Sequence, residues 1–245
     1  MKKIIGLLFL GLIGVAEAQI DSAITIPLVG VHLGGQVPFK DLAERFGPNL
    51  NAGGSFMIKT KKNWVFGIES NYFFGRNVKE DVLSQLKNAD GFMIDNEGYP
   101  ADVRVTERGI GIHLFAGRVF KLASNNPNSG LMVNIGFGYL QHKIKLYDAA
   151  QKIAAIKGNL SHGFDRLSAG FSLTQFVGYL FLSENRLLNF YAGVEFYEAF
   201  TTSIRKLNYD TGLPDHRPRF DGLTGFRVGW ILPLYKKRPN DFYYN

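Results

Sequence analysis

The chain of 245 residues has no cysteine, and after its N-terminus it has no apolar run long enough to cross a bilayer as a helix. Without cysteine it cannot form a disulfide framework, a cysteine-based zinc or iron–sulfur site, or a thiol nucleophile. Charge of either sign is not extreme, with 28 Lys and Arg against 21 Asp and Glu. A hydrophobic share of 46% and an aromatic share of 14% exclude a disordered chain. These values predict one ordered domain that leans toward β-structure.

The longest apolar run occupies residues 4–15, directly after two lysines. It ends before residues 16–18, whose Ala-Glu-Ala sequence puts small residues at the −3 and −1 positions of a cleavage site. A basic start, a short apolar run and this ending are typical of a secretory signal peptide. The run is too short for a membrane-spanning helix, which needs roughly 20 residues. We therefore expect residues 1–18 to be a signal peptide and the mature chain to begin at Gln19.

From Gln19 onward, apolar residues recur with a period of two, which is typical of β-strands with one apolar face. One face of each segment carries Leu, Val, Ile and aromatic residues, whereas the other carries most of the glycines and polar residues. This pattern predicts eight strands, at residues 28–37, 50–60, 64–75, 107–119, 131–142, 167–182, 188–199 and 222–234.

The connections between these strands alternate in length. Short polar turns are expected at residues 61–63, 125–130 and 183–186, whereas the longest loops are expected at 78–106 and 201–221. An even number of strands with this alternation is typical of outer-membrane barrels. We therefore predict an all-β fold, an eight-stranded antiparallel up-and-down transmembrane β-barrel with short periplasmic turns and long extracellular loops. The barrel spans residues 19–235, and residues 236–245 form a short basic and aromatic periplasmic tail. A soluble lipocalin-like barrel is the alternative, but it would place most glycines and several charges outside.

The apolar face contains aromatic residues near both ends of the predicted strands, as in the two aromatic girdles of membrane barrels. The predicted girdle residues are Trp64, Tyr179 and Trp230 at the short-turn end, and Tyr72, Phe74, Tyr139 and Phe196 at the long-loop end.

Four titratable side chains fall on the polar, inward face. Glu195 and Arg227 lie on neighbouring predicted strands and could lie side by side, and Glu69 and His113 form a second inward pair at similar depth. We interpret these four residues as a structural lumen charge cluster, because buried charges persist when they are paired and hydrogen-bonded. A gate or a catalytic carboxylate pair is the functional alternative. An open pore is not expected with eight strands.

Two pairs in the predicted loops could support hydrolysis at the rim of the barrel. Asp215 and His216 could activate water, and Ser161 and His162 could be a nucleophile with its base. No third group at a diagnostic spacing orients either pair. The sequence therefore predicts no catalytic residue, no metal site and no cofactor.

Basic residues collect near the predicted short-turn end, as possible contacts to a partner or to lipid phosphates. These are Lys61, Lys62, Lys236, Lys237 and Arg238. The long loops carry apolar residues, notably at 82–86, 92–94 and 153–156, which either form a binding surface or fold back over the barrel mouth. We expect outer-membrane lipid, including lipopolysaccharide, and other envelope proteins as partners, and no nucleic acid.

The whole mature chain resembles small outer-membrane barrels of the outer membrane protein A transmembrane type, and it is similar to those of Bacteroidota. The residues behind this resemblance are VHLGG at 31–35, NAGGSF at 51–56 followed by KKNW at 61–64, and GFRVGW at 225–230. The chain departs from this type at its end, where a basic, proline-containing tail replaces a terminal aromatic strand. In that phylum, similar barrels are subunits of large envelope machines for type IX secretion and for outer-membrane protein assembly.

The resemblance thus implies a non-enzymatic barrel of a Gram-negative outer membrane that serves as a structural or accessory subunit of a secretion or assembly complex. A rim-active lipid or peptide hydrolase and a narrow transport pore are the alternatives.

Overall fold

The computed structural model describes residues 23–122, 126–150, 152–183 and 187–234. The expected signal peptide at 1–18 and the expected tail at 236–245 lie outside these residues. No helix within the described ranges is long and apolar enough to span a membrane.

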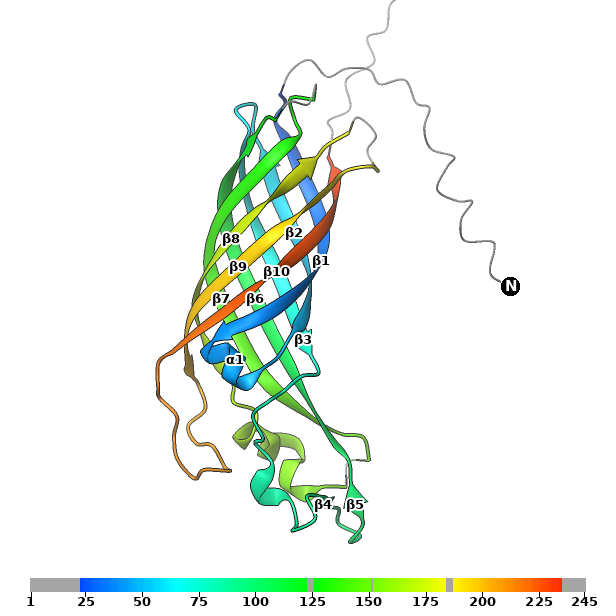
Figure 1. Cartoon of the computed structure of the whole chain (residues 1–245), viewed down its shortest axis with the longest axis vertical. Helices are drawn as coiled ribbons and strands as arrows, with labels where there is room; N and C mark the ends of the chain where they lie inside the picture. Colours follow the sequence, from blue (N-terminus) through cyan, green and yellow to red (C-terminus); the bar gives the residue numbers. More distant parts are fainter. Residues whose placement is uncertain (1–22, 123–125, 151, 184–186, 235–245) are drawn as a thin grey trace, which may run out of the picture.

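Eight antiparallel strands close into one barrel, as the alternating pattern predicts, and the structure confirms this fold class (Figure 1). The strands follow one another around the wall in chain order, and β1 pairs with β10 to close the ring. Their bounds are β1 Ile26–Lys40, β2 Asn49–Lys59, β3 Trp64–Gly75, β6 Val103–Phe120, β7 Gly130–Asp148, β8 Ser168–Phe181, β9 Phe190–Ser203 and β10 Arg219–Pro233.

The long connections all lie at one end of the barrel, below it in Figure 1, and the short turns lie at the other. Helix α1 (Asp41–Arg45) joins β1 to β2, and a two-stranded hairpin, β4 (Met93–Ile94) with β5 (Pro100–Ala101), lies in the connection from β3 to β6. Short 3-10 turns occur at Ser84–Leu86, Ala154–Ile156 and Gly158–Gly163. We refer to residues 41–48, 76–102, 149–150, 152–167 and 204–218 together as the loop cap.

The outer face of the barrel is a band of exposed apolar side chains, because alternate residues of a strand point to opposite sides of the sheet. Fourteen examples, between 39% and 66% exposed, are Val31, Leu33, Phe66, Ile68, Ile112, Leu114, Ile135, Phe137, Phe171, Val177, Val194, Phe200, Phe226 and Val228. A soluble protein rarely exposes an apolar surface of this extent. The register therefore matches the predicted orientation of apolar residues outward and glycine and polar residues inward.

Strands β6 and β7 extend further into the loop cap than the sequence pattern predicts. Residues Val103–Thr106, before the predicted strand start at 107, pair with Lys145–Asp148, beyond the predicted strand end at 142. The pattern missed this extension because the outward residues here are charged or polar, so apolar alternation stops while the backbone ladder continues. The inner face also carries more large apolar residues than expected, as described below.

Candidate functional site

The centre of the lumen is built around Arg227 on β10, which lies between two carboxylates. Its Nη1 donates to Glu69 Oε2 at 2.7 Å, and its Nε lies 3.0 Å from Glu195 Oε2. The guanidinium also lies over the ring of Phe176, 4.8 Å from the ring centroid. All three ionic side chains are at most 7% exposed. The arrangement satisfies a buried cation with two anions and an aromatic face, as buried charges require.

Neutral amides complete this layer. Gln36 Nε2 and Asn51 Nδ2 both donate to Glu195 Oε1, at 2.7 and 2.8 Å. His113 lies directly across from Glu69 in the strand register, but its Nε2 is within 2.6 Å of Ser172 Oγ. The structure thus brings Glu69, Glu195 and Arg227 into direct contact and places His113 beside them with a different hydrogen-bond partner.

Two apolar clusters enclose the charged layer, one toward each end of the barrel. The cluster at the short-turn end consists mainly of Ile26, Leu28, Met57, Val65, Phe115, Val119, Met132, Phe176, Leu180, Tyr191 and Ile231. The cluster at the long-loop end includes Phe73, Leu140, Ile144, Tyr197 and Leu223 from the strands. Because Asn51, His113 and Glu195 between them are no more than 1% exposed, the lumen is filled with side chains rather than open to water.

Glycines make room for this packing. A Cβ at Gly53 would lie 2.4 Å from His32 Nε2, and a Cβ at Gly34 would lie 2.4 Å from Asn51 Oδ1. At these two glycines a neighbouring polar side chain crosses the narrow lumen, whereas at Gly67 the Phe115 ring takes the space, 2.6 Å from where a Cβ would lie.

The predicted girdle residues lie on the outer face, but not all of them lie near a strand end. Trp64 and Trp230 are 43% and 45% exposed near the short-turn end, where Trp230 Nε1 donates to the carbonyl of Leu187. Tyr72 and Phe74 lie near the long-loop end of β3, and Tyr179 near the short-turn end of β8. Tyr139 and Phe196 instead lie near the middle of β7 and β9, because these strands continue to Asp148 and Ser203.

The loop cap is held together by a second ionic cluster, which we call the loop clamp. Arg45 Nε donates to Glu80 Oε2 at 2.7 Å, and Arg166 Nε donates to Glu80 Oε1 at 2.6 Å. Arg166 also forms a two-pronged pair with Asp210, at 2.9 and 2.5 Å. These four residues come from four different connections, so the clamp joins every loop at this end of the barrel. Burial alone would raise the pKa of Glu80, but the charges of Arg45 and Arg166 outweigh it and lower that pKa.

Apolar loop residues pack down onto the barrel mouth. Val82, Leu83, Met93, Ile153, Ile156 and Phe164 join the apolar cluster at the long-loop end. By contrast, Phe92, Ile94 and Tyr99 are 55%, 44% and 66% exposed. The first set therefore folds back over the barrel mouth, as one of the two interpretations predicts. The second set faces outward, and its role as a binding surface stays a prediction.

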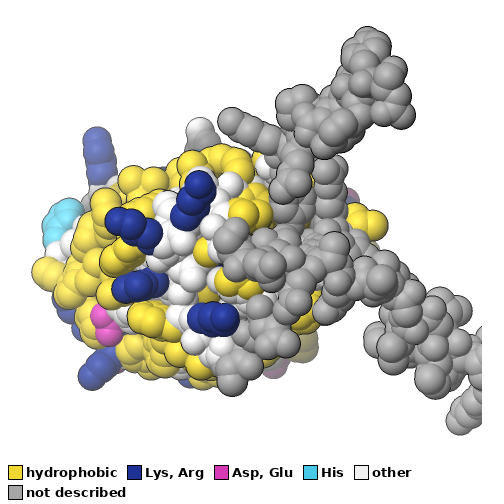
Figure 2. All heavy atoms as spheres, turned by 90° about the horizontal axis from the view of Figure 1, so that it is seen from above, with side chains coloured by type: hydrophobic (Ala, Val, Ile, Leu, Met, Phe, Trp, Pro, Cys, Tyr) yellow, Lys and Arg dark blue, Asp and Glu magenta, His cyan; other side chains and the backbone are white. Residues whose placement is uncertain are grey.

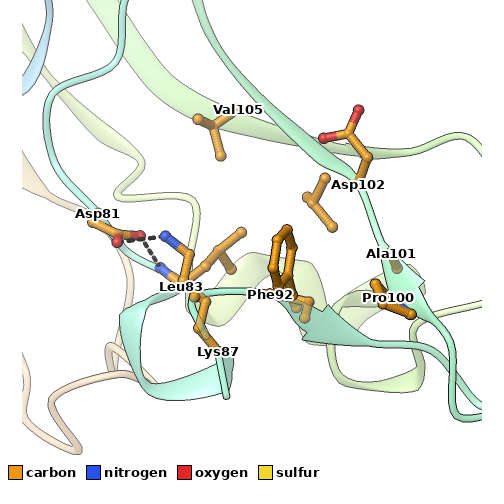
Figure 3. Close-up of a pocket in the computed structure, with 11 residues that line it drawn as sticks. Asp81, Leu83, Lys87, Phe92, Pro100, Ala101, Asp102 and Val105 are labelled. Carbon is orange, nitrogen blue, oxygen red and sulfur yellow. Dashed lines mark hydrogen bonds and ion pairs between the residues drawn. The ribbon is translucent and has the colours of Figure 1, made fainter. Parts of the chain in front are cut away.

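A cavity of about 470 Å³ lies between the hairpin and the base of β6 (Figure 3). The Phe92 ring lines it, with Leu83, Val105 and Pro100. Asp81 forms part of its rim, where it accepts from the backbone N–H of Leu83 and from Lys87 Nζ. The cavity is lined mainly by apolar groups, which suits an apolar side chain of a partner better than a charged substrate.

The two pairs considered for hydrolysis do not form a catalytic arrangement. Ser161 Oγ donates to the carbonyl of Gly158, and Asp215 Oδ1 accepts from the backbone N–H of Arg217. His162 and His216 are exposed, and no other residue in the described part of the chain hydrogen-bonds their rings. Within the same residues, no group of three potential ligands is placed to hold a metal ion.

Lys and Arg side chains are visible among hydrophobic and uncharged ones on the short-turn end of the molecule (Figure 2). Lys61 and Lys62 are exposed in the turn from β2 to β3. The other predicted basic contacts, Lys236, Lys237 and Arg238, lie outside the described residues.

The sequence pattern did not predict two features of this structure. The loop clamp joins residues up to 121 positions apart, since Arg45 also donates to the carbonyl of Arg166, and no sequence spacing indicates it. Basic residues also occur on the outer face at the long-loop end, at Arg104, Arg108, Lys143 and Lys145. Their even spacing, of four positions on β6 and two on β7, puts each pair on one face of its strand and was a usable signal.

The sequence matches no family model and no curated protein. Among solved structures, Ail, the attachment invasion locus protein of Yersinia pestis, has a TM-score of 0.44 at 9% identity, over 85% of this chain and 99% of that one. Ail in complex with the heparin analogue sucrose octasulfate has a TM-score of 0.41 at 12% identity, over 85% and 99%. The N-terminal β-barrel domain of Pseudomonas aeruginosa OprF has a TM-score of 0.38 at 11% identity, over 84% and 97%. The similarity is loose, and the architecture described here follows from the strand pairing itself.

Proposed function

We propose that this chain is an integral barrel of a Gram-negative outer membrane, without enzymatic activity, that serves as a structural or accessory subunit of a larger envelope complex. The sequence resemblance implies a complex for protein secretion or for outer-membrane protein assembly. The Bacteroidota origin stays a prediction of the sequence.

The observation that carries the proposal is the combination of an exposed apolar band with a filled lumen. The band fits a lipid environment, because apolar side chains on the outer face of a closed barrel are stable in lipid and unfavourable in water. The filled lumen, with buried charges at its centre, favours a scaffold over a conducting pore.

The loop cap supports the role in docking. The loop clamp and the apolar cluster hold it in one arrangement, so a partner would bind without first ordering these loops. Exposed Phe92 lines a mainly apolar cavity, and Ile94 and Tyr99 are exposed in the same connection. Large aromatic residues are enriched where proteins bind one another. We therefore place the docking surface at the hairpin.

The test is native electrophoresis of the tagged protein after extraction from its own membrane in mild detergent. We expect a band of defined size above that of the monomer, and we expect Phe92→Ser/Ile94→Ser to abolish it. Leu213→Ser is the matched control, because Leu213 is 64% exposed in another loop. Migration of the wild-type protein as a lone monomer, or equal migration of all three proteins, would overturn the docking role.

A further inference from the structure

Five basic residues line the outer face where the apolar band meets the loop cap. They are Arg76, Arg104, Arg108, Lys143 and Lys145, and we call them the basic belt. Arg104 and Arg108 point outward from β6, and Lys143 and Lys145 from β7, because outward residues alternate along each strand. A cavity of about 640 Å³ is lined by four of them, with Val105, Thr106 and Tyr147.

The belt concentrates like charges that no carboxylate neutralises. Arg108 lies directly opposite Lys143 in the strand register, and Lys145 lies opposite Thr106, one step diagonal to both Arg104 and Arg108. Like charges that face one another across strands destabilise a sheet. Within the described part of the chain, none of the five forms an ion pair with Asp or Glu.

Three acidic residues lie near the belt in the chain, and none of them pairs with it. Asp102, two positions before Arg104, is exposed and forms no ion pair with the five basic residues in the described part of the chain. Glu107, next to Arg108, points inward and accepts from Asn49 Nδ2 at 3.0 and 3.1 Å. Asp148, at the end of β7, accepts from the backbone N–H groups of Ala150 and Ile153. The arrangement is therefore complementary to an anion from outside the chain.

The position of the belt indicates where that anion comes from. From Arg108 toward the short-turn end, the next outward residues of β6 are Ile110, Ile112 and Leu114, which are 45%, 47% and 51% exposed. On β7, Lys143 is followed toward the short-turn end by Gln141 and Tyr139. The basic residues thus begin where the apolar band ends, which is the level of lipid headgroups for a barrel in a membrane.

We propose that the basic belt binds the phosphate groups of an anionic lipid of the outer leaflet, and that this lipid is phosphorylated lipid A. Two arginines that project from one strand can each form paired hydrogen bonds with phosphate oxygens, and the lysines add charge around them. The phosphates relieve the repulsion across β6 and β7, while the acyl chains lie along the apolar band. This inference rests on the proposed membrane location and adds a lipid-specific site to it.

The probe is bis-phosphorylated lipid A, titrated into the full-length protein in uncharged detergent micelles and followed by microscale thermophoresis. We expect Arg104→Gln/Arg108→Gln to weaken its binding roughly 30-fold. The matched control is Lys157→Gln/Lys206→Gln, which removes the same charge from exposed loop positions and should change the affinity less than threefold. Lipid A without its phosphates should bind the wild-type protein no better than it binds the double arginine variant.

The proposal would be overturned if both double variants lost affinity for phosphorylated lipid A equally, or if the arginine variant kept its affinity. It would also be overturned if inorganic phosphate bound as tightly as phosphorylated lipid A, because free phosphate would then be the ligand. Heat-modifiable migration in detergent gels reports the folded barrel separately. If the wild-type protein shows this gel shift but does not bind lipid A, only the lipid site is rejected. If the wild-type protein shows no gel shift, the membrane barrel itself is rejected.

Discussion

Two arginines in this molecule each lie between two carboxylates, one inside the barrel and one in the loop cap. Arg227 contacts Glu69 and Glu195, and all three belong to strands of the closed wall. Arg166 contacts Glu80 and Asp210, and all three lie in connections outside that wall. The two arginine side chains are almost equally buried, at 5% and 8% exposed.

The difference lies in what else holds the partners in place. The strands that carry Arg227 are already joined by continuous backbone ladders, so its ion pairs neutralise buried charges rather than define the fold. The loops that carry the clamp share only isolated backbone hydrogen bonds, such as the one from Lys79 N–H to the carbonyl of Arg45, and no continuous ladder. Their arrangement therefore depends on the ion pairs together with the apolar cluster. The same chemistry therefore supports the stability of the wall in one region and the order of the loops in the other.

The largest effect is expected from Arg227→Met. This change leaves Glu69 and Glu195 buried without a cation, and breaking a buried pair from one side costs about 3–5 kcal/mol. We expect a lower urea midpoint for unfolding of the purified protein in detergent micelles, measured by the gel shift of the folded barrel. Arg227→Met/Glu69→Gln/Glu195→Gln removes the charges together and should recover most of the loss. An unchanged midpoint in the single variant would show that the lumen pairs contribute no stability.

A smaller and local effect is expected from Arg166→Gln. The clamp loses the contacts of Arg166 to Glu80 and Asp210. This loss lowers the free energy of local opening of the loop cap by about 1–3 kcal/mol but leaves the strand ladders intact. Trypsin should cleave the loop cap faster, while the urea midpoint of the barrel stays the same. Arg217→Gln is the control, because its pair with Glu44 is exposed and 3.9 Å long. If Arg166→Gln lowered the urea midpoint for unfolding of the barrel as much as Arg227→Met does, the proposed difference between the two regions would be wrong.

The smallest effect is expected from pH, through Glu80. Its pKa is lowered in the folded protein, so its contribution is complete above the ordinary carboxyl pKa of 4.5 and is lost as the pH falls from there through the folded value. Protease sensitivity of the loop cap should therefore rise below about pH 4.5 while the barrel stays folded. In Glu80→Gln this pH step should disappear. A step that persists in the variant would assign it to another carboxylate.

The wall was predictable because each strand repeats its own two-residue pattern. Glu195 and Arg227 could be paired from sequence, since their strands are neighbours in the chain and in the wall. The contact of Arg227 with Glu69 could not, because it crosses the lumen and depends on the width and stagger of the barrel.

The loop cap was predictable only in part. The apolar residues at 82–83 and 153–156 indicated packing or binding, yet the choice of partner depends on where four separate connections meet. Arg166 and Asp210, for example, are 44 positions apart and belong to no repeating pattern. Such contacts are fixed by the closed barrel, which brings the ends of β7, β8, β9 and β10 to one rim.

The most direct test of the account uses the two tryptophans, Trp64 and Trp230, which both lie on the outer face. Trp64→Phe and Trp230→Phe each leave one fluorophore, and the proteins are reconstituted into vesicles of lipid brominated near the head of the acyl chain. The account predicts strong quenching of both variants by the brominated lipid and little quenching by aqueous iodide. Quenching by iodide with no effect of the brominated lipid would contradict it, because the apolar face would then not lie in a membrane.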